Sequence, residues 1–178
     1  MKSFFSAAAL ALLFGGGCFF GSYRDITQYD LTIHPADGPT AGKRFAAQEF
    51  QNRSGAGTRF QYREGGGRIV TDPDRKWVLP PEELIPRALN AAFPAAPAGA
   101  PVCRVRGVVE YFEASRPTGK FIFSGSYELL DDGKERREKN FRIEVPLPAD
   151  SPEALVEAAS RAVAELARQI RAADAGER

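Results

Sequence analysis

The sequence of 178 residues contains one histidine, one tryptophan, one methionine and two cysteines. It has no Cys-x-x-Cys, no His-Glu-x-x-His and no Gly-x-Ser-x-Gly, so the common zinc and serine-nucleophile motifs are missing. We therefore expect no metal, no cofactor and no enzymatic activity. An enzyme that works with carboxylates alone would leave a weaker signature, and it stays open as an alternative.

An excess of charge of one sign is also missing. Lys2 is the only charged residue among the first 17, so the rest of the chain carries 23 basic and 23 acidic residues. A nucleic-acid-binding surface normally shows a strong basic excess or a basic stripe, so we expect no nucleic acid partner. The basic cluster at 134–139 is interrupted by Glu135 and Glu138. We interpret it as a solvated strand or hairpin edge, with an anion site as the alternative.

The N-terminus contains an uncharged apolar stretch, residues 3–14, that follows Lys2. A membrane-spanning helix needs about 20 apolar residues, whereas this shorter length is typical of a signal peptide. Three glycines and then Cys18 follow, which is the arrangement of small residues that a lipoprotein signal peptidase requires. The sequence therefore predicts a signal peptide over residues 1–17 and a lipidated Cys18. Gly15 departs from the usual aliphatic residue, so an ordinary secretory signal and an uncleaved anchor remain alternatives.

Acylation of Cys18 has consequences for location and for the second cysteine. Several acyl chains together hold a protein stably on a bilayer. Phe19, in place of an aspartate, favours the outer membrane over the inner one, although anchoring in the inner membrane stays open. Cys103 then has no partner within the chain, and its apolar surroundings indicate a buried, inert thiol. A reactive thiol, or a disulfide between the two cysteines if Cys18 is not acylated, are the alternatives.

The chain after the leader is predicted to form one domain. We expect the lipidated cysteine and a tether over residues 18–26, a single periplasmic domain over 27–172 and a frayed tail over 173–178. Alternating apolar residues predict a strand from Ile26 to Ile33, followed by a turn that contains His34 as a surface loop residue. A weaker strand is expected over 43–50.

Next, residues 58–63 and 68–71 are expected to form a hairpin around the triple glycine at 65–67. The glycines are not followed by Lys-Ser or Lys-Thr, which argues against a phosphate-binding loop. Asp72-Pro73-Asp74 predicts a turn.

Two amphipathic helices are predicted. The first covers residues 81–93, with Pro86 in or just after the first turn, where its missing amide costs little. The second begins after Ser151, which is a suitable N-cap before Pro152. Their apolar stripes are Leu84, Ile85, Ala88, Leu89, Ala92 and Phe93 in the first, and Leu155, Ala159, Ala162, Val163, Leu166, Ala167 and Ile170 in the second.

Between the helices, residues 102–112, 121–129 and 141–147 predict three strands joined by turns at 115–119 and 131–133. The adjacent carboxylates Asp131 and Asp132 are explained by the second turn. The predicted fold class is α+β: a two-layer domain with a mostly antiparallel sheet, a three-stranded C-terminal meander and two amphipathic helices packed on one face.

The arrangement of these segments resembles the ABC-type transport auxiliary lipoproteins, the Pqi-type outer-membrane partners of MCE lipid-transport systems. The resemblance covers nearly the whole chain after the leader, in patterns of strand and helix more than in invariant signatures. It rests on Cys18, Tyr29-Asp30-Leu31, Trp77 with Pro80-Pro81, the helix at 84–89, the strands at 108–113 and 127–131, and the alanine-rich helix that ends at 164–167.

This resemblance implies a non-enzymatic domain held on the outer membrane through acylated Cys18. It also implies docking to an MCE-domain protein of an ABC transport system that moves lipid, with phospholipid as the expected cargo and a homo-oligomeric ring as an expected assembly. A periplasmic regulator or assembly lipoprotein, for peptidoglycan synthesis or lipopolysaccharide insertion, is the alternative.

The lipoprotein hypothesis is testable with Cys18→Ser. Without the thiol there is no site for the acyl chains, so we expect the variant to leave the membrane fraction and to lose labelling by radioactive fatty acid. Cys103→Ser, which changes the other cysteine, should keep both properties. Continued membrane association and labelling of the Cys18→Ser protein would refute the hypothesis.

Overall fold

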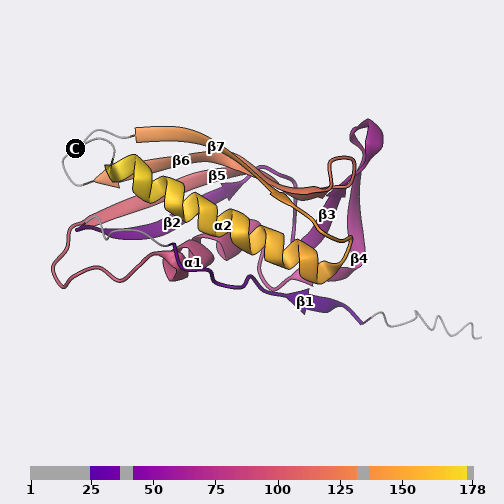
Figure 1. The fold of residues 1–178 in the computed structure, drawn as a ribbon, viewed down its shortest axis with the longest axis horizontal. Helices are drawn as coiled ribbons and strands as arrows, with labels where there is room; N and C mark the ends of the chain where they lie inside the picture. The colour runs from indigo at the N-terminus through magenta and orange to yellow at the C-terminus, as the bar shows by residue number, and fades with distance from the viewer. Residues whose placement is uncertain (1–24, 37–41, 132–136, 176–178) are drawn as a thin grey trace, which may run out of the picture.

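The structure, a computed structural model, describes residues 25–36, 42–131 and 137–175 (Figure 1). The predicted leader and Cys18 lie outside these residues, as do residues 134–136 of the basic cluster at 134–139. The elements are β1 (Thr27–Tyr29), β2 (Arg44–Asn52), β3 (Arg59–Arg63), a short 3-10 turn (Gly65–Gly67), β4 (Ile69–Trp77), α1 (Pro81–Ala92), β5 (Val102–Ser115), β6 (Lys120–Asp131), β7 (Arg137–Pro146) and α2 (Pro152–Ala175).

The described strands form one seven-stranded sheet in the order β1-β4-β3-β5-β6-β7, with β2 also paired to β5. The long strand β5 has two neighbours along the same edge. Its first part pairs with β2, from Val102 opposite Arg44 onward, and its last two residues pair with β3, where Ala114 lies opposite Tyr62. β6 occupies the other edge of β5 over nearly its whole length.

The sheet is mixed, and the expectation of a mostly antiparallel sheet is wrong in this respect. The meander β5-β6-β7 is antiparallel, as predicted, and so is the β3-β4 hairpin. However, β1 runs parallel to β4, and β2 and β3 both run parallel to β5. Parallel neighbours need a long crossover connection, and α1 provides one between the first strands and β5. Alternation of apolar residues reveals a strand but not its direction.

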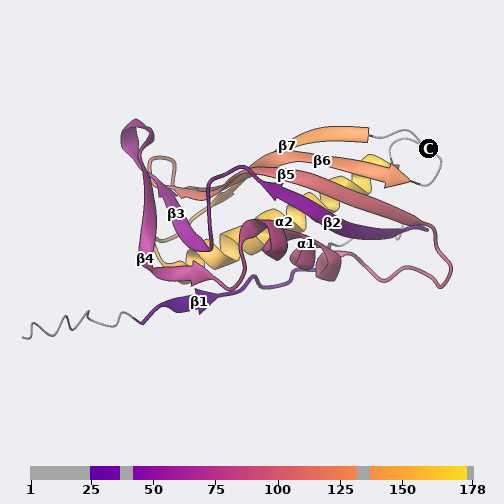
Figure 2. The ribbon, with the colours of Figure 1, turned by 180° about the vertical axis from the view of Figure 1, so that it is seen from behind.

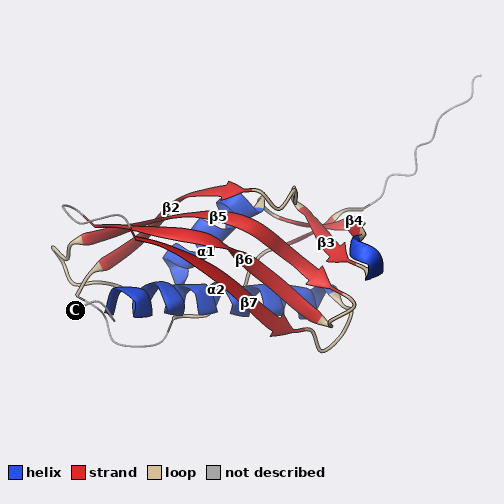
Figure 3. Cartoon of the chain, turned by 90° about the horizontal axis from the view of Figure 1, so that it is seen from above, coloured by secondary structure: helices blue, strands red, loops and turns tan. Residues whose placement is uncertain are grey.

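Both predicted helices are present and lie against the sheet (Figures 1 and 3). α1 packs mainly on β2, α2 packs on β6 and β7, and the two helices also contact each other. All residues of the two predicted stripes are buried. The predicted N-cap is also present, because Ser151 Oγ accepts a hydrogen bond of 3.2 Å from the Ala154 amide.

Three boundaries differ from the sequence expectation. The first strand covers only Thr27–Tyr29, and Ile33 is exposed. The Asp72-Pro73-Asp74 turn lies inside β4 as a bulge, because Asp72 Oδ1 accepts hydrogen bonds of 2.9 and 3.0 Å from the amides of Asp74 and Arg75. The strand bends there without ending. Finally, α2 continues to Ala175, beyond the expected end at residue 172.

The space between sheet and helices is filled by a chain of aromatic rings. Trp77 lies 4.5 Å from Phe60 and 5.5 Å from Phe112, measured between ring centroids. Phe112 in turn contacts Phe121 and Phe123 edge-on, and the series continues to Phe141. Edge-to-face pairs add stability beyond the apolar area that they bury. The rings join β3, β4 and the meander into one core.

The outer edge of β2 is covered by a side chain of α1. Asn90 Oδ1 accepts a hydrogen bond of 2.8 Å from the Ala47 amide, and Asn90 Nδ2 donates one of 2.8 Å to the Ala47 carbonyl. The carboxamide thus takes the place of a further strand. An unprotected strand edge is a template for unwanted pairing, and α1 removes part of it here.

The packing predicts a specific effect of Gly125→Ala. Gly125 in β6 faces the point where the register of β5 shifts, between Val109 and Tyr111. An added Cβ would lie 1.8 Å from the Val108 carbonyl oxygen, so the backbone would have to move. We expect the free energy of unfolding in urea to fall by about 1–3 kcal/mol or more.

Gly57→Ala is the matched control, because an added Cβ at Gly57 meets nothing within 4 Å. The control should unfold at nearly the wild-type urea concentration. Equal midpoints for both variants would show that the close approach at Gly125 is relaxed in solution.

Candidate docking surface and buried ion cluster

Side chains on the sheet alternate between two environments. One set, which includes Val105, Phe123 and Leu129, is buried in the core beneath the helices. The other set points away from the helices, on the side of the sheet that Figure 3 shows without a helix. We call this side, over β2, β5, β6 and β7, the open face.

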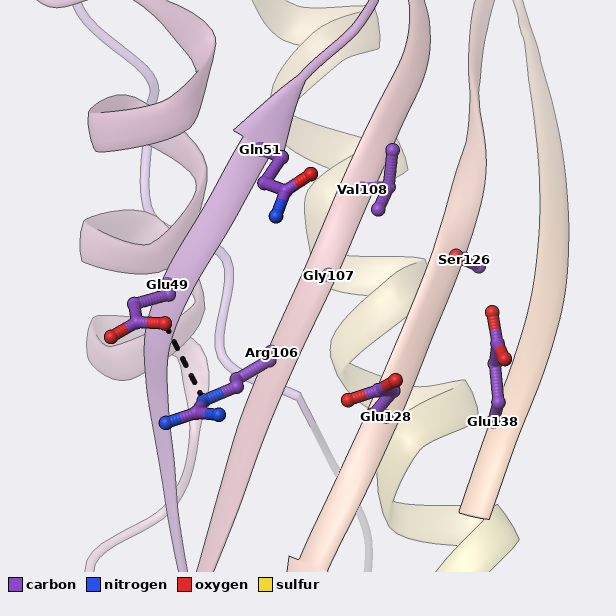
Figure 4. Close-up of a pocket in the computed structure, with 8 residues that line it drawn as sticks. All are labelled: Glu49, Gln51, Arg106, Gly107, Val108, Ser126, Glu128 and Glu138. Carbon is purple, nitrogen blue, oxygen red and sulfur yellow. Dashed lines mark ion pairs between the residues drawn. The ribbon is translucent and has the colours of Figure 1, made fainter. Parts of the chain in front are cut away.

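A polar groove crosses the open face (Figure 4). The strand register places Arg106 opposite Glu128, and Glu128 opposite Glu138. Arg106 also pairs with Glu49 of β2, at 3.6 Å between Nε and Oε2. A row of charged side chains therefore runs across four strands. The groove is lined by Glu49, Gln51, Arg106, Gly107, Val108, Ser126, Glu128 and Glu138.

The groove has a mostly polar lining over a filled core. Gly107 contributes no side chain to either face, and the Phe50 ring fills the space beneath it, where a Cβ would lie 2.4 Å from Phe50 Cε1. Glu49 is 76% exposed and its carboxylate reaches into solvent. Ser126 and Gln51 supply further hydrogen-bonding groups. Charged and polar side chains therefore make up most of this lining.

An ion pair and two cation–π contacts join β3 to the end of β5. Arg63 of β3 donates a hydrogen bond to Glu113, which is only 3% exposed. The Arg63 guanidinium lies over the Tyr111 ring, 5.3 Å from the ring centroid. Arg116 similarly lies 4.6 Å from the centroid of Tyr62. These contacts fix β3 against the end of β5, and we assign them a structural role.

Sequence reasoning missed a buried ion cluster at the end of the molecule where β6 and α2 end. Lys43 Nζ donates hydrogen bonds of 2.7 Å to Asp131 Oδ2 and of 2.7 Å to Asp174 Oδ1. The three side chains are 15%, 8% and 2% exposed, respectively. Asp131 was expected in a turn, but it is the last residue of β6 and serves this cluster. The cluster ties the start of β2 to β6 and to the end of α2.

The electrostatics of the cluster explain the state of the second cysteine. Cys103 is fully buried beside Asp131, and burial together with that carboxylate raises the pKa of its thiol to about 12. A thiol with this pKa stays protonated at neutral pH and is a poor nucleophile. The burial of Cys103 agrees with the sequence expectation, and its raised pKa disfavours the reactive thiolate.

The single histidine contacts α2. His34 is partly buried, and its Nε2 lies 3.3 Å from Glu157 of α2. Within residues 25–36, 42–131 and 137–175, no group of histidine, cysteine and carboxylate side chains is arranged to hold a metal ion. In the same ranges, neither helix combines the length and the apolar character that crossing a bilayer demands.

The fold defines a mixed α+β domain with a polar groove on the open face of its sheet. Residues 57–171 match the family of the ABC-type transport auxiliary lipoprotein component. The match spans more than half of the sequence, and the chain belongs to this family. No curated protein matches it.

Solved structures share the fold. A crystal structure of an uncharacterised protein superimposes with a TM-score of 0.65 at 15% identity, covering 83% of this chain and 97% of that one. Protein XCC0632 from Xanthomonas campestris gives a TM-score of 0.64 at 14% identity, covering 81% of this chain and 92% of its own. At such identities the likeness concerns the fold alone.

The ion cluster predicts a pH-dependent effect of Lys43→Met. Burial alone would lower the pKa of Lys43, but hydrogen bonds to Asp131 and Asp174 outweigh it and raise the pKa above 10.5. Its stabilising contribution is therefore complete below pH 10.5 and lost only as the pH rises through the higher folded value. Removing the shared cation should cost about 3–5 kcal/mol of unfolding free energy at pH 7.

Lys120→Met is the control, since Lys120 is 42% exposed and its pair with Glu144 should contribute at most about 1 kcal/mol. Urea unfolding at pH 7 and pH 9 should give the same deficit for Lys43→Met. A deficit that disappears by pH 9 would mean that Lys43 is already neutral there.

Proposed function

We propose that the chain is a membrane-anchored accessory lipoprotein of an MCE/ABC-type lipid transport system. It acts by docking to the periplasm-spanning assembly, and phospholipid is the cargo of that assembly. Membership of the transport auxiliary lipoprotein family carries the proposal. Cys18 is its lipid attachment site, and the outer membrane is the bilayer that holds it.

The filled core supports docking over carriage of lipid by this domain itself. The layer between helices and sheet is occupied by the ring series from Phe60 through Trp77 to Phe141. A protein that carries a lipid needs an apolar cavity large enough for most of the ligand. Within the described residues, the groove on the open face is instead lined largely by charged and polar side chains.

We assign docking to the open face. The opposite side of β2, β5, β6 and β7 is packed against α1 and α2, so among the described residues these four strands are offered directly to a partner on the open face. Glu49, Glu128 and Glu138 outnumber Arg106 around the groove. The complementary surface on the MCE-type partner would therefore present lysine or arginine side chains, because opposite charges steer association and fix register. Several copies arranged as a ring would display this face repeatedly.

Site-specific photo-crosslinking in cells tests the docking surface. A photoreactive residue replaces Gln51, which lines the groove, or Arg168, which is 47% exposed on the outer side of α2. Both positions are accessible, so the comparison isolates location. We expect a crosslink to an MCE-type protein from position 51 and none from position 168.

The identity of the captured protein decides between functions. Crosslinks only to a peptidoglycan synthase would reject the transport role. Crosslinks to an MCE-type protein from position 168 alone would keep that role but move the docking surface to the helices.

A further inference from the structure

The molecule is elongated, and its two ends differ. In Figures 1 and 2, β1, the tip of the β3-β4 hairpin and the β5-β6 turn lie towards one end of the long axis, which we call the tether end. Figure 3 shows the hairpin at the same end. β6 and α2 end at the opposite end, with the Lys43 cluster. The hairpin and the β5-β6 turn are in direct contact, because Arg116 Nη1 donates a hydrogen bond of 2.8 Å to Glu64.

The length of chain before β1 limits how far the tether end can lie from a bilayer. Asp25 is the first described residue and follows Cys18 by seven positions. At about 3.3–3.6 Å per extended residue, this segment reaches about 25 Å at most. If Cys18 is acylated, as the proposed function requires, Asp25 is therefore held within about 25 Å of the acyl chains, and the end of the molecule to which it belongs faces the bilayer.

The hairpin tip has the chemistry of a lipid-headgroup contact. Gly65–Gly67 present backbone without side chains, and an added Cβ at any of the three would meet nothing within 4 Å. Arg68 is 71% exposed and Ile69 41% exposed. Ile26, which precedes β1, is a second large apolar residue left exposed at this end.

The charge of the hairpin also favours contact with lipid headgroups. Residues 59–77 contain five basic and three acidic residues. At the tip, the carboxylate of Glu64 is shared by Arg68 and Arg116, and Arg116 also pairs with Asp150 at 3.4 Å, so that Arg68 is the more exposed cation. A guanidinium group binds phosphate through a pair of hydrogen bonds, and basic residues near an anionic leaflet are attracted to it.

From these observations we infer that the tip of the β3-β4 hairpin, residues 64–69, rests on the phospholipid surface in which the acylated Cys18 is embedded. Arg68 contacts headgroup phosphates, and Ile69 enters the boundary between headgroups and acyl chains. Together with the tether, the tip forms a two-point contact. The domain consequently stands with its long axis away from the bilayer, and it presents the far end and the open face to the periplasm.

Fluorescence quenching on the full, acylated chain tests this contact. A dye is attached to Gly65→Cys at the tip or to Ala98→Cys, an exposed position in the α1-β5 loop at the far end. Native Cys103 does not compete, because it is fully buried and has a pKa of about 12. The protein is reconstituted in vesicles of three parts phosphatidylethanolamine to one part phosphatidylglycerol, with a nitroxide on a fraction of the headgroups.

We expect quenching at position 65 to be several-fold stronger than at position 98. Adding Arg68→Glu and Ile69→Asp to the Gly65→Cys protein should remove most of this difference, while flotation with the vesicles stays unchanged. Equal quenching at the two positions in a protein that floats would overturn the hairpin contact and leave the anchor intact.

Two other results would also overturn the inference. If the full chain does not float with vesicles at all, the anchor is absent and the contact falls with it. If position 65 becomes shielded only when an MCE-type protein is added, the tip is a protein interface.

Discussion

Strand β5 changes both its edge partner and its inward face at nearly the same point along its length. Before the register shift between Val109 and Tyr111, its neighbour is β2, and odd-numbered residues such as Val105 and Val109 face the core. After the shift its neighbour is β3, and Phe112 and Ala114 are buried instead. A slip of one residue moves every following side chain to the other face of a sheet. The bulge makes that slip once, at a defined position.

The remaining sheet depends on this change. Because β2 leaves the edge of β5 before the strand ends, β3 can join the same edge and carry β4 and β1 with it. Gly125 permits the close approach of β6 at the shift, where a side chain would collide with the Val108 carbonyl. Phe112, the first inward residue after the shift, contacts Trp77, Phe121 and Phe123, so the aromatic series runs through the reorganised part of the strand.

Features that depend on residues close together in the sequence could be predicted, whereas features that depend on distant residues could not. Helix stripes, the Ser151 cap and the meander are encoded by neighbours a few residues apart, and each was found. The parallel pairing of β2 with β5 was not, because strand direction depends on connections of some 50 residues. The Lys43 cluster was missed for the same reason.

Local sequence patterns gave wrong predictions for the two carboxylates of the Lys43 cluster. Asp131 beside Asp132 and Gly133 has the composition of a turn, and Asp174 near the C-terminus has that of a frayed end. Only the folded chain brings both to Lys43. The charged groove was equally hidden, since Glu49, Arg106, Glu128 and Glu138 come from four strands and carry no common spacing.

Polar groups have different roles at the two ends of the molecule. Ion pairs buried at the far end, where Asp174 is 2% exposed, fix the last turns of α2 and resist local opening. At the tether end, Arg68, Ile69, Ile26 and a glycine turn are exposed and are not part of the core. Stability alone does not require an exposed isoleucine beside a bare backbone turn at the tether end. A bilayer at that end gives the apolar side chain a place to be buried and leaves the charged open face for a partner in water.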